Sequence, residues 1–494
     1  MGFEIYLSLA IYFVVMLGIG LYAYKKSTGD LSEYMLGGRK LGPAVTALSA
    51  GASDMSGWML LGLPGSIYVS GLSGMWIAVG LSIGAYLSYV FVAPRLRTYT
   101  EVANDSITIP DYFENRFVDN TKILRFVSAI VIIIFFTVYT SSGMVAGGVL
   151  FESAFGFDYF TGLIVTAGVV LAYTLFGGFL AVSMTDFVQG CIMFVALILV
   201  PIVAFIELGG VGPTFDTLNS IDPTLTSFFE GTTVLGFLGL MAWGLGYFGQ
   251  PHIIVRFMAI RDVKALKTAR RIGISWMVIG VIGAVFTGLT GLAYVTTKGE
   301  ELADPETIFV FFSQVLFHPM ISGFLLAAIL AAIMSTISSQ LLVTSSALTE
   351  DFYNTFLKRK ASDKELVFVG RVSVLLVAIV AVSLSLNSDS SILDLVSNAW
   401  AGFGSAFGPA ILLSLYWKGM NRWGALAGML VGTITVILWV YVFDLSGFLY
   451  EMIPGFFLSL LAIILVSKMT GGSRKVTRAG YDSFEKVHEV ESNK

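Results

Sequence analysis

Long apolar runs separated by short polar stretches follow one another along nearly the whole chain. A run of about 20 apolar residues is long enough for a helix to cross the hydrocarbon core of a bilayer. We expect spans near 5–24, 43–66, 74–94, 124–150, 160–179, 187–206, 232–255, 272–296, 319–349, 369–387, 393–416, 423–443 and 448–467. This pattern predicts an all-α polytopic membrane protein with about 13 transmembrane helices.

The positions of lysine and arginine test this count. Of the 29 Lys and Arg residues, 28 fall in the predicted loops after odd-numbered spans or in the tail, and only Lys298 falls on the other side. Loops rich in Lys and Arg face the cytoplasm. We therefore expect a multi-pass protein of the cell (plasma) membrane with its N-terminus outside and its C-terminus in the cytoplasm. No Lys or Arg precedes the first run, so we interpret it as a span and not as a signal peptide.

Composition excludes several other classes of protein. The chain has 494 residues, of which 56% are hydrophobic and 13% charged, and its mean hydropathy is +0.83. Soluble domains carry about 25% charged residues. One cysteine, Cys191, and three scattered histidines leave no disulfide framework and no metal-ligand spacing. We expect no soluble catalytic domain, no nucleic-acid partner and no obligate protein partner.

A single carboxylate, Asp54, lies inside the second predicted span. A charge at membrane depth costs at least ~2.5 kcal/mol and must face a cavity, a cation or another polar group. Gly51 and Gly57 flank it, with Ser53 and Ser56 between them, and this composition weakens a helix and frees backbone carbonyls. A carboxylate beside free carbonyls and hydroxyls suits a hard cation such as Na⁺. The alternative is a polar residue satisfied within a helix bundle.

A second weak helix occurs five spans later. Residues Trp243 to Pro251 contain three glycines and end in a proline, which a regular membrane helix does not hold. Broken helices at matching positions of two halves indicate an inverted-repeat transporter with a central site. The alternative is that the glycines only allow close helix packing.

This interpretation divides the chain into five parts. They are 1–42 (first helix and cytoplasmic loop), 43–206 (first repeat, spans 2–6), 232–416 (second repeat, spans 7–11), 417–467 (spans 12–13) and 468–494 (cytoplasmic tail). The fold expected is a five-plus-five inverted repeat with broken helices in spans 2 and 7.

Aromatic and hydroxyl side chains lie near these breaks. The rings are Trp58, Tyr139, Trp243 and Tyr247, and at mid-membrane depth they suit an apolar ring or a cationic nitrogen. At the headgroup level they would be ordinary anchors. In span 9, the Ser335-Thr336 pair and Ser339 place hydroxyls on one side of a helix. Bonding to their own helix carbonyls is the alternative role.

These motifs, in this order, resemble the sodium/solute symporter family over essentially the whole membrane region. The stretches that carry the resemblance are 36–39, 48–58, 177–182, 185–189, 243–252, 331–336 and 399–404. The stretch after Gly177 is typical of the family broadly, whereas those around Asp54 and Trp243 resemble its proline-transporting branch.

The resemblance implies roles for individual residues. It implies a sodium site between spans 2 and 9 formed by the carbonyls of Ala52, Met55 and Ala332 and the hydroxyls of Ser335 and Thr336. It implies that Asp54 orients this site from close by and that Arg39 couples sodium to the cytoplasmic gate. It implies a solute site formed by Ser53, Ser56, Gly57, Trp58, Tyr139, Trp243, Tyr247 and Pro251. Ser339 stands where the resemblance leads us to expect cysteine, and a hydroxyl in place of the thiol is compatible with the site.

The function expected is Na⁺-coupled uptake of L-proline by alternating access, with Na⁺ as the co-transported ion and no organic cofactor. The alternative is sodium-coupled symport of another small solute, such as a different amino acid, a carboxylate or a vitamin. An intramembrane aspartyl protease needs a second carboxylate at the depth of Asp54, and Asp186 is expected in a short inner loop. A sensor would need a kinase or receiver domain after span 13. We therefore expect a transporter and not an enzyme.

Overall fold

The computed structural model describes residues 2–26, 31–357, 361–386, 391–471, 482 and 484–487. Within these ranges the chain is helical, and its β structure is limited to one isolated bridge between Leu41 and Ile260. Ten of the described helices are long and apolar enough to cross a membrane. The expectation of an all-helical polytopic membrane protein is therefore confirmed, whereas the count of thirteen spans stays a prediction.

The helices have the following bounds. Those in the first part of the chain are α1 (Phe3–Lys26), α2 (Leu31–Leu36), α3 (Pro43–Asp54), α4 (Leu63–Ser70), α5 (Trp76–Leu87), α6 (Ala93–Val102), α7 (Ile109–Phe117), α8 (Ile123–Phe155), α9 (Tyr159–Glu207) and α10 (Val211–Ile221). Those that follow are α11 (Val234–Ala242), α12 (Pro251–Ala259), α13 (Ala265–Lys298), α14 (Ile308–Val315), α15 (Pro319–Ser346), α16 (Asp363–Leu384), α17 (Ile392–Tyr416), α18 (Arg422–Ile437) and α19 (Met452–Met469). Short 3₁₀ segments are η1 (Gly37–Arg39), η3 (Gly71–Met75), η5 (Pro223–Thr226), η6 (Trp243–Phe248) and η7 (Pro305–Thr307). The π-helical segments are η2 (Trp58–Gly62), η4 (Ser88–Val92), η8 (Ala347–Leu357) and η9 (Leu438–Val442).

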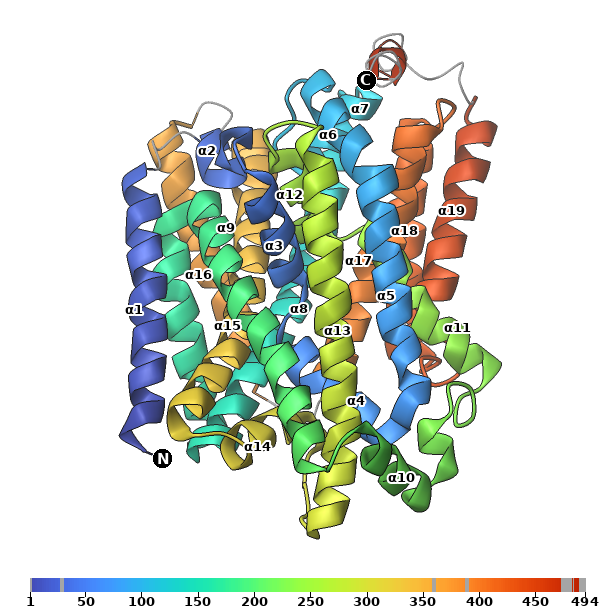
Figure 1. The fold of residues 1–494 in the computed structure, drawn as a ribbon. Helices are drawn as coiled ribbons and strands as arrows, with labels where there is room; N and C mark the ends of the chain where they lie inside the picture. The colour runs from blue at the N-terminus through green and yellow to red at the C-terminus, as the bar shows by residue number, and fades with distance from the viewer. Residues whose placement is uncertain are drawn as a thin grey trace.

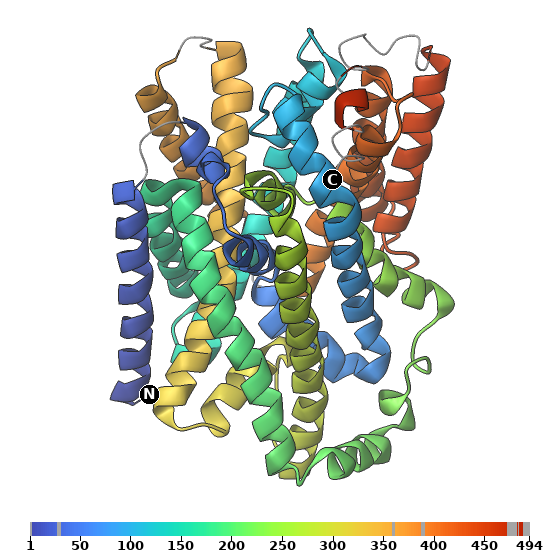
Figure 2. The same cartoon turned by 45° about the horizontal axis from the view of Figure 1, so that its top comes forward.

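Helices α15 and α17 lie at the centre of the bundle. In both, 83% of the most apolar stretch is buried, against 28% in α1 and 33% in α18 and α19. Helix α1 packs on α9 and α15, while α18 and α19 pack on each other and on α17. Both views place α1 and the α18–α19 pair at opposite edges (Figure 1, Figure 2). The peripheral helices expose many large apolar side chains, as a lipid-facing surface does.

The two ends of the bundle differ. Helix α1 begins at the lower end in Figure 1, and α19 runs toward the upper end, where α2, α6 and α7 also lie. We refer to this upper end as the α6–α7 end. Arg39 and Arg125, both assigned to the cytoplasmic side by sequence, lie at this end, where they pair with Asp105 and with Asp111 of α7.

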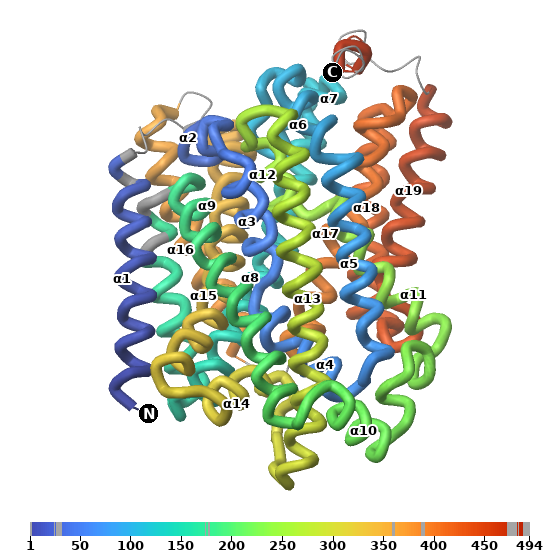
Figure 3. Tube along the Cα trace, in the orientation of Figure 1, coloured from blue at the N-terminus to red at the C-terminus, as the bar shows by residue number. Residues whose placement is uncertain are grey.

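The helix interruption expected around Gly51 to Gly57 is present. Helix α3 ends at Asp54, Met55 leaves helical geometry with φ −82° and ψ 78°, and the chain resumes as π-helical η2 and then α4. Figure 3 follows the Cα trace through this break. The break frees carbonyl groups beside the carboxylate of Asp54, because residues at a helix end lack the usual intrahelical partners.

The second expected interruption is also present. Helix α11 passes into 3₁₀-helical η6, Gln250 adopts extended geometry, and α12 begins at Pro251. Glycine is required at Gly244, because a Cβ there would lie 2.2 Å from the carbonyl oxygen of Gly80 in α5. The interrupted segment therefore packs directly against the backbone of α5. The inverted-repeat relationship between residues 43–206 and 232–416 stays a prediction.

The position expected for Asp186, in a short inner loop, is wrong. Helix α9 runs from Tyr159 to Glu207 and is kinked at Gly178, whose φ of +59° suits glycine. The second part of the helix begins at this kink, so Asp186 lies inside it and is fully buried. Arg256, expected in an inner loop, is likewise fully buried within α12. The two charges form an ion pair, and neither therefore needs a loop exposed to water.

Candidate functional site

The hydroxyls of α15 meet the interrupted end of α3. Ser335 Oγ donates a hydrogen bond to the carbonyl of Ala52 at 2.7 Å and lies 3.2 Å from that of Ala332. Thr336 Oγ1 donates to the same Ala52 carbonyl at 3.3 Å. Met55 caps the C-terminus of α3, so its carbonyl lies beyond the hydrogen-bond ladder of that helix. The five residues expected around sodium thus come from two helices that join at this point, with oxygen ligands of the kind a hard cation takes.

Asp54 connects this junction to the rest of the site. Its carboxylate Oδ2 accepts a hydrogen bond from the Tyr247 hydroxyl, whereas its buried Oδ1 has no hydrogen-bond partner among the described residues. Its backbone carbonyl accepts hydrogen bonds from Trp58 Nε1 at 3.0 Å, from the Tyr139 hydroxyl at 3.4 Å and from the Ser56 amide at 2.9 Å. Asp54 therefore contacts three of the aromatic residues expected at the solute site. Its carboxylate oxygen Oδ1 remains available to accept a further bond.

The aromatic rings form a continuous wall around Trp243. The ring of Trp58 lies 6.4 Å from it, and the Tyr450 ring stacks on it at 5.4 Å with an angle of 17°. Trp400 Nε1 donates to the Trp243 carbonyl at 2.8 Å, and its ring lies 5.1 Å from that of Tyr247. Trp400 and Tyr450 were not expected at this site. Trp400 belongs to a stretch that carries the family resemblance, whereas Tyr450 lies near the start of the predicted span 448–467 and gives no local signal.

Four of the expected solute residues lie apart from the aromatic wall or face their own backbone. Ser53 Oγ donates to the carbonyl of Ala50, one turn back in α3. Ser56 Oγ accepts from the amide of Trp58 at 3.3 Å. Gly57 allows close packing, because a Cβ there would lie 2.8 Å from the Ala146 side chain. Pro251 lines a separate cavity that it shares with the carboxylate residue Asp351.

A small cavity lies beside Asp54. It is lined by residues of α3, α5, η4, η6, α12 and α13, among them Gly51, Asp54, Tyr247 and Met277, and by Met55, which follows α3. Its volume is about 20 Å³, which is room for little more than one water molecule. An amino acid does not fit in this cavity.

A buried ion pair links four helices one turn away from the sodium junction. Arg256 Nη2 lies 3.2 Å from Asp186 Oδ2 and donates to Ser339 Oγ at 2.6 Å, while Nε donates to Ser49 Oγ at 3.0 Å. Ser49 Oγ donates to the same Asp186 oxygen at 2.7 Å, and Arg256 Nη1 donates to the His252 carbonyl at 2.7 Å. This network explains why a hydroxyl at position 339 is tolerated, since it accepts from Arg256. The sequence concealed the network, because both charges lie at predicted span ends.

Arg39 joins several chain segments at the α6–α7 end through hydrogen bonds. Its guanidinium donates to Asp105 Oδ1 at 2.9 Å, to Thr100 Oγ1 at 3.1 Å, and to the carbonyls of Met258 and Ser106, both at 2.8 Å. Next to it, the Leu41 amide donates to the Ala259 carbonyl at 3.2 Å, and the Arg261 amide donates to the Leu41 carbonyl at 3.0 Å. The chain segments that lead into α3 and out of α12 are therefore joined at the same end of the bundle.

The fold and these two interrupted helices define a polytopic membrane transporter. A family model described as the sodium:solute symporter family matches residues 34–432, and the chain belongs to this family. The chain is 62% identical to the osmoregulated proline transporter OpuE of Bacillus subtilis (strain 168), with 99% of each chain covered. It is 62% identical to the high-affinity proline transporter PutP of the same organism, over 95% of this chain and 99% of that protein. It is 56% identical to the sodium/proline symporter of Staphylococcus aureus (strain NCTC 8325 / PS 47), over 95% of this chain and 93% of that protein.

A solved structure shows the same fold at low sequence identity. A Na⁺-coupled sialic acid symporter, in a substrate-bound outward-open state, matches with a TM-score of 0.81 at 20% identity, covering 95% of this chain and 99% of that one. The family and the named relatives are transporters, so the expectation that this chain is not an enzyme is confirmed.

Proposed function

We propose that the protein couples the inward movement of Na⁺ to the uptake of L-proline across the cell membrane by alternating access. The observation that carries this proposal is the junction of Ser335, Thr336 and the Ala52 carbonyl beside the carboxylate of Asp54. The proline-transporting relatives, at 56–62% identity over almost the whole chain, support the choice of solute.

In this proposal Na⁺ binds between α3 and α15. The carbonyls of Ala52, Met55 and Ala332 and the hydroxyls of Ser335 and Thr336 are its ligands, and on ion entry both hydroxyls turn their oxygen lone pairs to the ion. Asp54 lies close by with one unpaired oxygen, which supplies negative charge to the site.

The solute binds against the aromatic wall. Trp58, Trp243 and Tyr247 provide flat apolar surfaces for the pyrrolidine ring, and Tyr139 adds a polar tip. Ser53, Ser56 and Gly57 belong to the proposed carboxylate side, and Pro251 bounds the proposed site toward the α6–α7 end. Tyr247 also donates a hydrogen bond to Asp54. This bond therefore connects a residue of the proposed solute site with the carboxylate beside the proposed ion site.

Coupling follows from the elements that these two sites share. The proposed architecture has thirteen spans, with 43–206 and 232–416 as inverted repeats, an external N-terminus and a cytoplasmic C-terminus. The α6–α7 end is then cytoplasmic, and Arg39 holds it closed through its four hydrogen bonds. Release of this contact opens the inner path.

The energy available suits uptake against a gradient. Proline is a zwitterion, so transport with one Na⁺ moves one net charge, worth ~2.3 kcal/mol per 100 mV of membrane potential. A tenfold sodium gradient adds ~1.4 kcal/mol. The sum of ~3.7 kcal/mol allows an accumulation of roughly 500-fold.

Equilibrium binding tests the proposed pairing of ligands. Purified protein in detergent is titrated with labelled proline in NaCl and in choline chloride at equal ionic strength. Because coupling between two ligands is reciprocal, sodium should tighten proline binding and proline should tighten sodium binding by the same factor. Equal proline affinity in both salts contradicts the proposal.

A further inference from the structure

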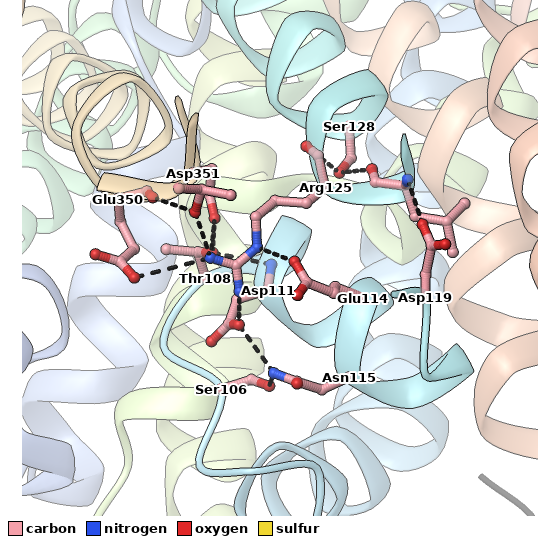
Figure 4. A network of polar contacts seen from close by, with 12 residues as sticks. Ser106, Thr108, Asp111, Glu114, Asn115, Asp119, Arg125, Ser128, Glu350 and Asp351 are labelled. Atoms are coloured by element: carbon pink, nitrogen blue, oxygen red, sulfur yellow. Dashed lines mark hydrogen bonds and ion pairs between the residues drawn. The ribbon is translucent and has the colours of Figure 1, made fainter. Parts of the chain in front are cut away.

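One arginine at the α6–α7 end is surrounded by four carboxylates (Figure 4). Arg125, near the start of α8, pairs with Asp111 and Glu114 of α7, and its Nη1 lies 3.8 Å from Glu350 Oε1 and 3.7 Å from Asp351 Oδ1 of η8. All five side chains are at most 17% exposed. We refer to these five residues as the Arg125 cluster.

Asp351 is the most deeply buried member of the cluster. Its side chain is 0% exposed, and its Oδ1 accepts a hydrogen bond from Thr108 Oγ1 at 2.8 Å. Its other oxygen, Oδ2, is buried without a hydrogen-bond partner among the described residues. Figure 4 shows the carboxyl group directed at the guanidinium and at Thr108. Asp351 also lines a cavity of about 20 Å³ between α7, α8, α12 and η8.

The charges of the cluster do not balance. Four ionised carboxylates around one guanidinium leave a net charge of −3, and like charges this close in a buried site disfavour full ionisation. The other groups that face the cluster are Lys122 beside Glu114 and Glu350, Asp105 beside Asp111, and the neutral Asn115, Asn354 and Thr355. A counter-charge is therefore required at the centre.

The burial of the cluster favours a proton as the counter-charge. Burial raises the pKa of Asp111 and of Glu114, although the nearby Arg125 opposes that shift. Burial thus favours the neutral form of both carboxyls, and the buried, unpaired Oδ2 of Asp351 offers a position for a proton.

We propose that the Arg125 cluster is a proton-binding site that fastens the end of the sodium-binding helix α15 to α7 and α8. Segment η8 continues α15 directly, so the helix that carries Ser335 and Thr336 runs on through Glu350 and Asp351 to Leu357. With the proton bound, Arg125 and Thr108 hold η8 against α7. When the proton leaves, repulsion among the carboxylates weakens this attachment.

The site makes the closed α6–α7 end sensitive to the pH on that side of the membrane. This consequence rests on the proposed function, in which that end is cytoplasmic and must open to release sodium and solute. Loss of the proton at higher cytoplasmic pH then favours opening. The proton belongs to the cluster as a unit, because strongly interacting carboxylates titrate together.

Thermal unfolding as a function of pH tests the proposal without proline or sodium. Purified full-length wild type, Asp351→Asn and Glu114→Gln are melted in choline chloride between about pH 5 and pH 8.5. Glu101→Gln is the matched control, because Glu101 pairs with Arg97 at the same end but is 55% exposed. A failure of the proposed sodium or proline coupling leaves this measurement unaffected.

Proton linkage determines whether the stability of the folded protein rises or falls with pH. The folded cluster keeps a proton that the same carboxyls in the unfolded chain lose at lower pH, so stability falls as pH rises between these two values and then levels off. The melting temperature of the wild type should fall relative to Asp351→Asn by about 1–2 °C per pH unit over that window. Glu114→Gln should also lose the slope, and it decides the test if Asp351→Asn does not fold.

Three results would overturn the proposal. One is a wild-type slope retained in both Asp351→Asn and Glu114→Gln. Another is loss of the pH dependence of the melting temperature in Glu101→Gln, which would show that this dependence comes from general surface charge. The third is a wild-type slope abolished by replacing choline with Na⁺ at constant ionic strength, which would make the cluster a metal-cation site.

Discussion

The hydroxyl of Tyr247 donates a hydrogen bond to the carboxylate of Asp54, across 193 positions of sequence. Each residue lies at the interruption of a helix, Asp54 at the end of α3 and Tyr247 within η6. The carboxylate belongs to the proposed ion site and the ring to the proposed solute site. One hydrogen bond thus connects the two ligands that the transporter must couple.

Removing this hydrogen bond should weaken proline binding. Tyr247→Phe keeps the ring and leaves the Asp54 carboxylate without its protein donor, which costs about 1.5–3 kcal/mol for a bond to a charged group. The half-saturating proline concentration should rise about 10- to 100-fold, measured by uptake at saturating sodium. Tyr89→Phe is the control, because the Tyr89 hydroxyl lines the same cavity but has no hydrogen-bond partner among the described residues. Equal effects of both variants would remove the Tyr247–Asp54 bond from the mechanism.

The two hydroxyls of α15 should affect sodium more than solute. Ser335→Ala and Thr336→Ala each remove one proposed ligand, so both should raise the half-saturating sodium concentration far more than they lower maximal uptake. Ser335 should have the larger effect, because it lies 2.7 Å from the Ala52 carbonyl against 3.3 Å for Thr336. Ser338→Ala serves as control, since Ser338 bonds the Ser335 carbonyl of its own helix. Sodium curves that match the wild type for both variants would exclude α15 from the ion site.

Trp243 should determine solute affinity. Three other rings surround it, and its removal opens the aromatic wall. Trp243→Ala should therefore raise the half-saturating proline concentration strongly while the sodium dependence at saturating proline changes little. Trp76→Phe, at a tryptophan that bonds the Phe228 carbonyl away from the site, is the control. A change confined to sodium dependence would show that the assignment is wrong.

Breaking the buried ion pair should destabilise the protein. Asp186→Asn leaves the fully buried Arg256 without its counter-charge, and loss of one partner of such a pair costs about 3–5 kcal/mol. Arg256→Gln alone should be similarly damaging. The double variant should recover part of the loss, because no unpaired charge remains. Thermal unfolding of the four proteins measures this, and additive losses in the double variant would argue against direct pairing.

The sequence predicted the features that follow from local composition. Apolar runs long enough to span, glycines and a proline that interrupt helices, and hydroxyls one turn apart on α15 all leave a pattern within a few residues. The residues Asp54, Tyr139, Trp58 and Tyr247 were chosen because polar or aromatic groups inside apolar runs are costly unless they have partners. The structure places these four in mutual contact through Asp54.

Partnerships across distant segments could not be predicted in the same way. Asp186 and Arg256 were assigned to loops, because an isolated charge at a span end normally faces water. Each is buried only because the other neutralises it, and 70 positions separate them. Tyr450 likewise joins the aromatic wall from the segment just before α19, and no pattern near position 450 indicates its contact with Trp243.

The central claim is that Asp54 supplies the charge that links sodium to proline. Sodium-driven uptake of labelled proline into liposomes, at equal amounts of reconstituted protein, tests it most directly in wild type, Asp54→Asn and Asp54→Glu. We expect uptake by the wild type only with an inward sodium gradient, none above background with Asp54→Asn, and partial activity with Asp54→Glu, which keeps the charge at a shifted position. Wild-type uptake by Asp54→Asn together with loss of activity in Asp54→Glu would contradict the account, since it would show that Asp54 is needed for its shape and not for its charge.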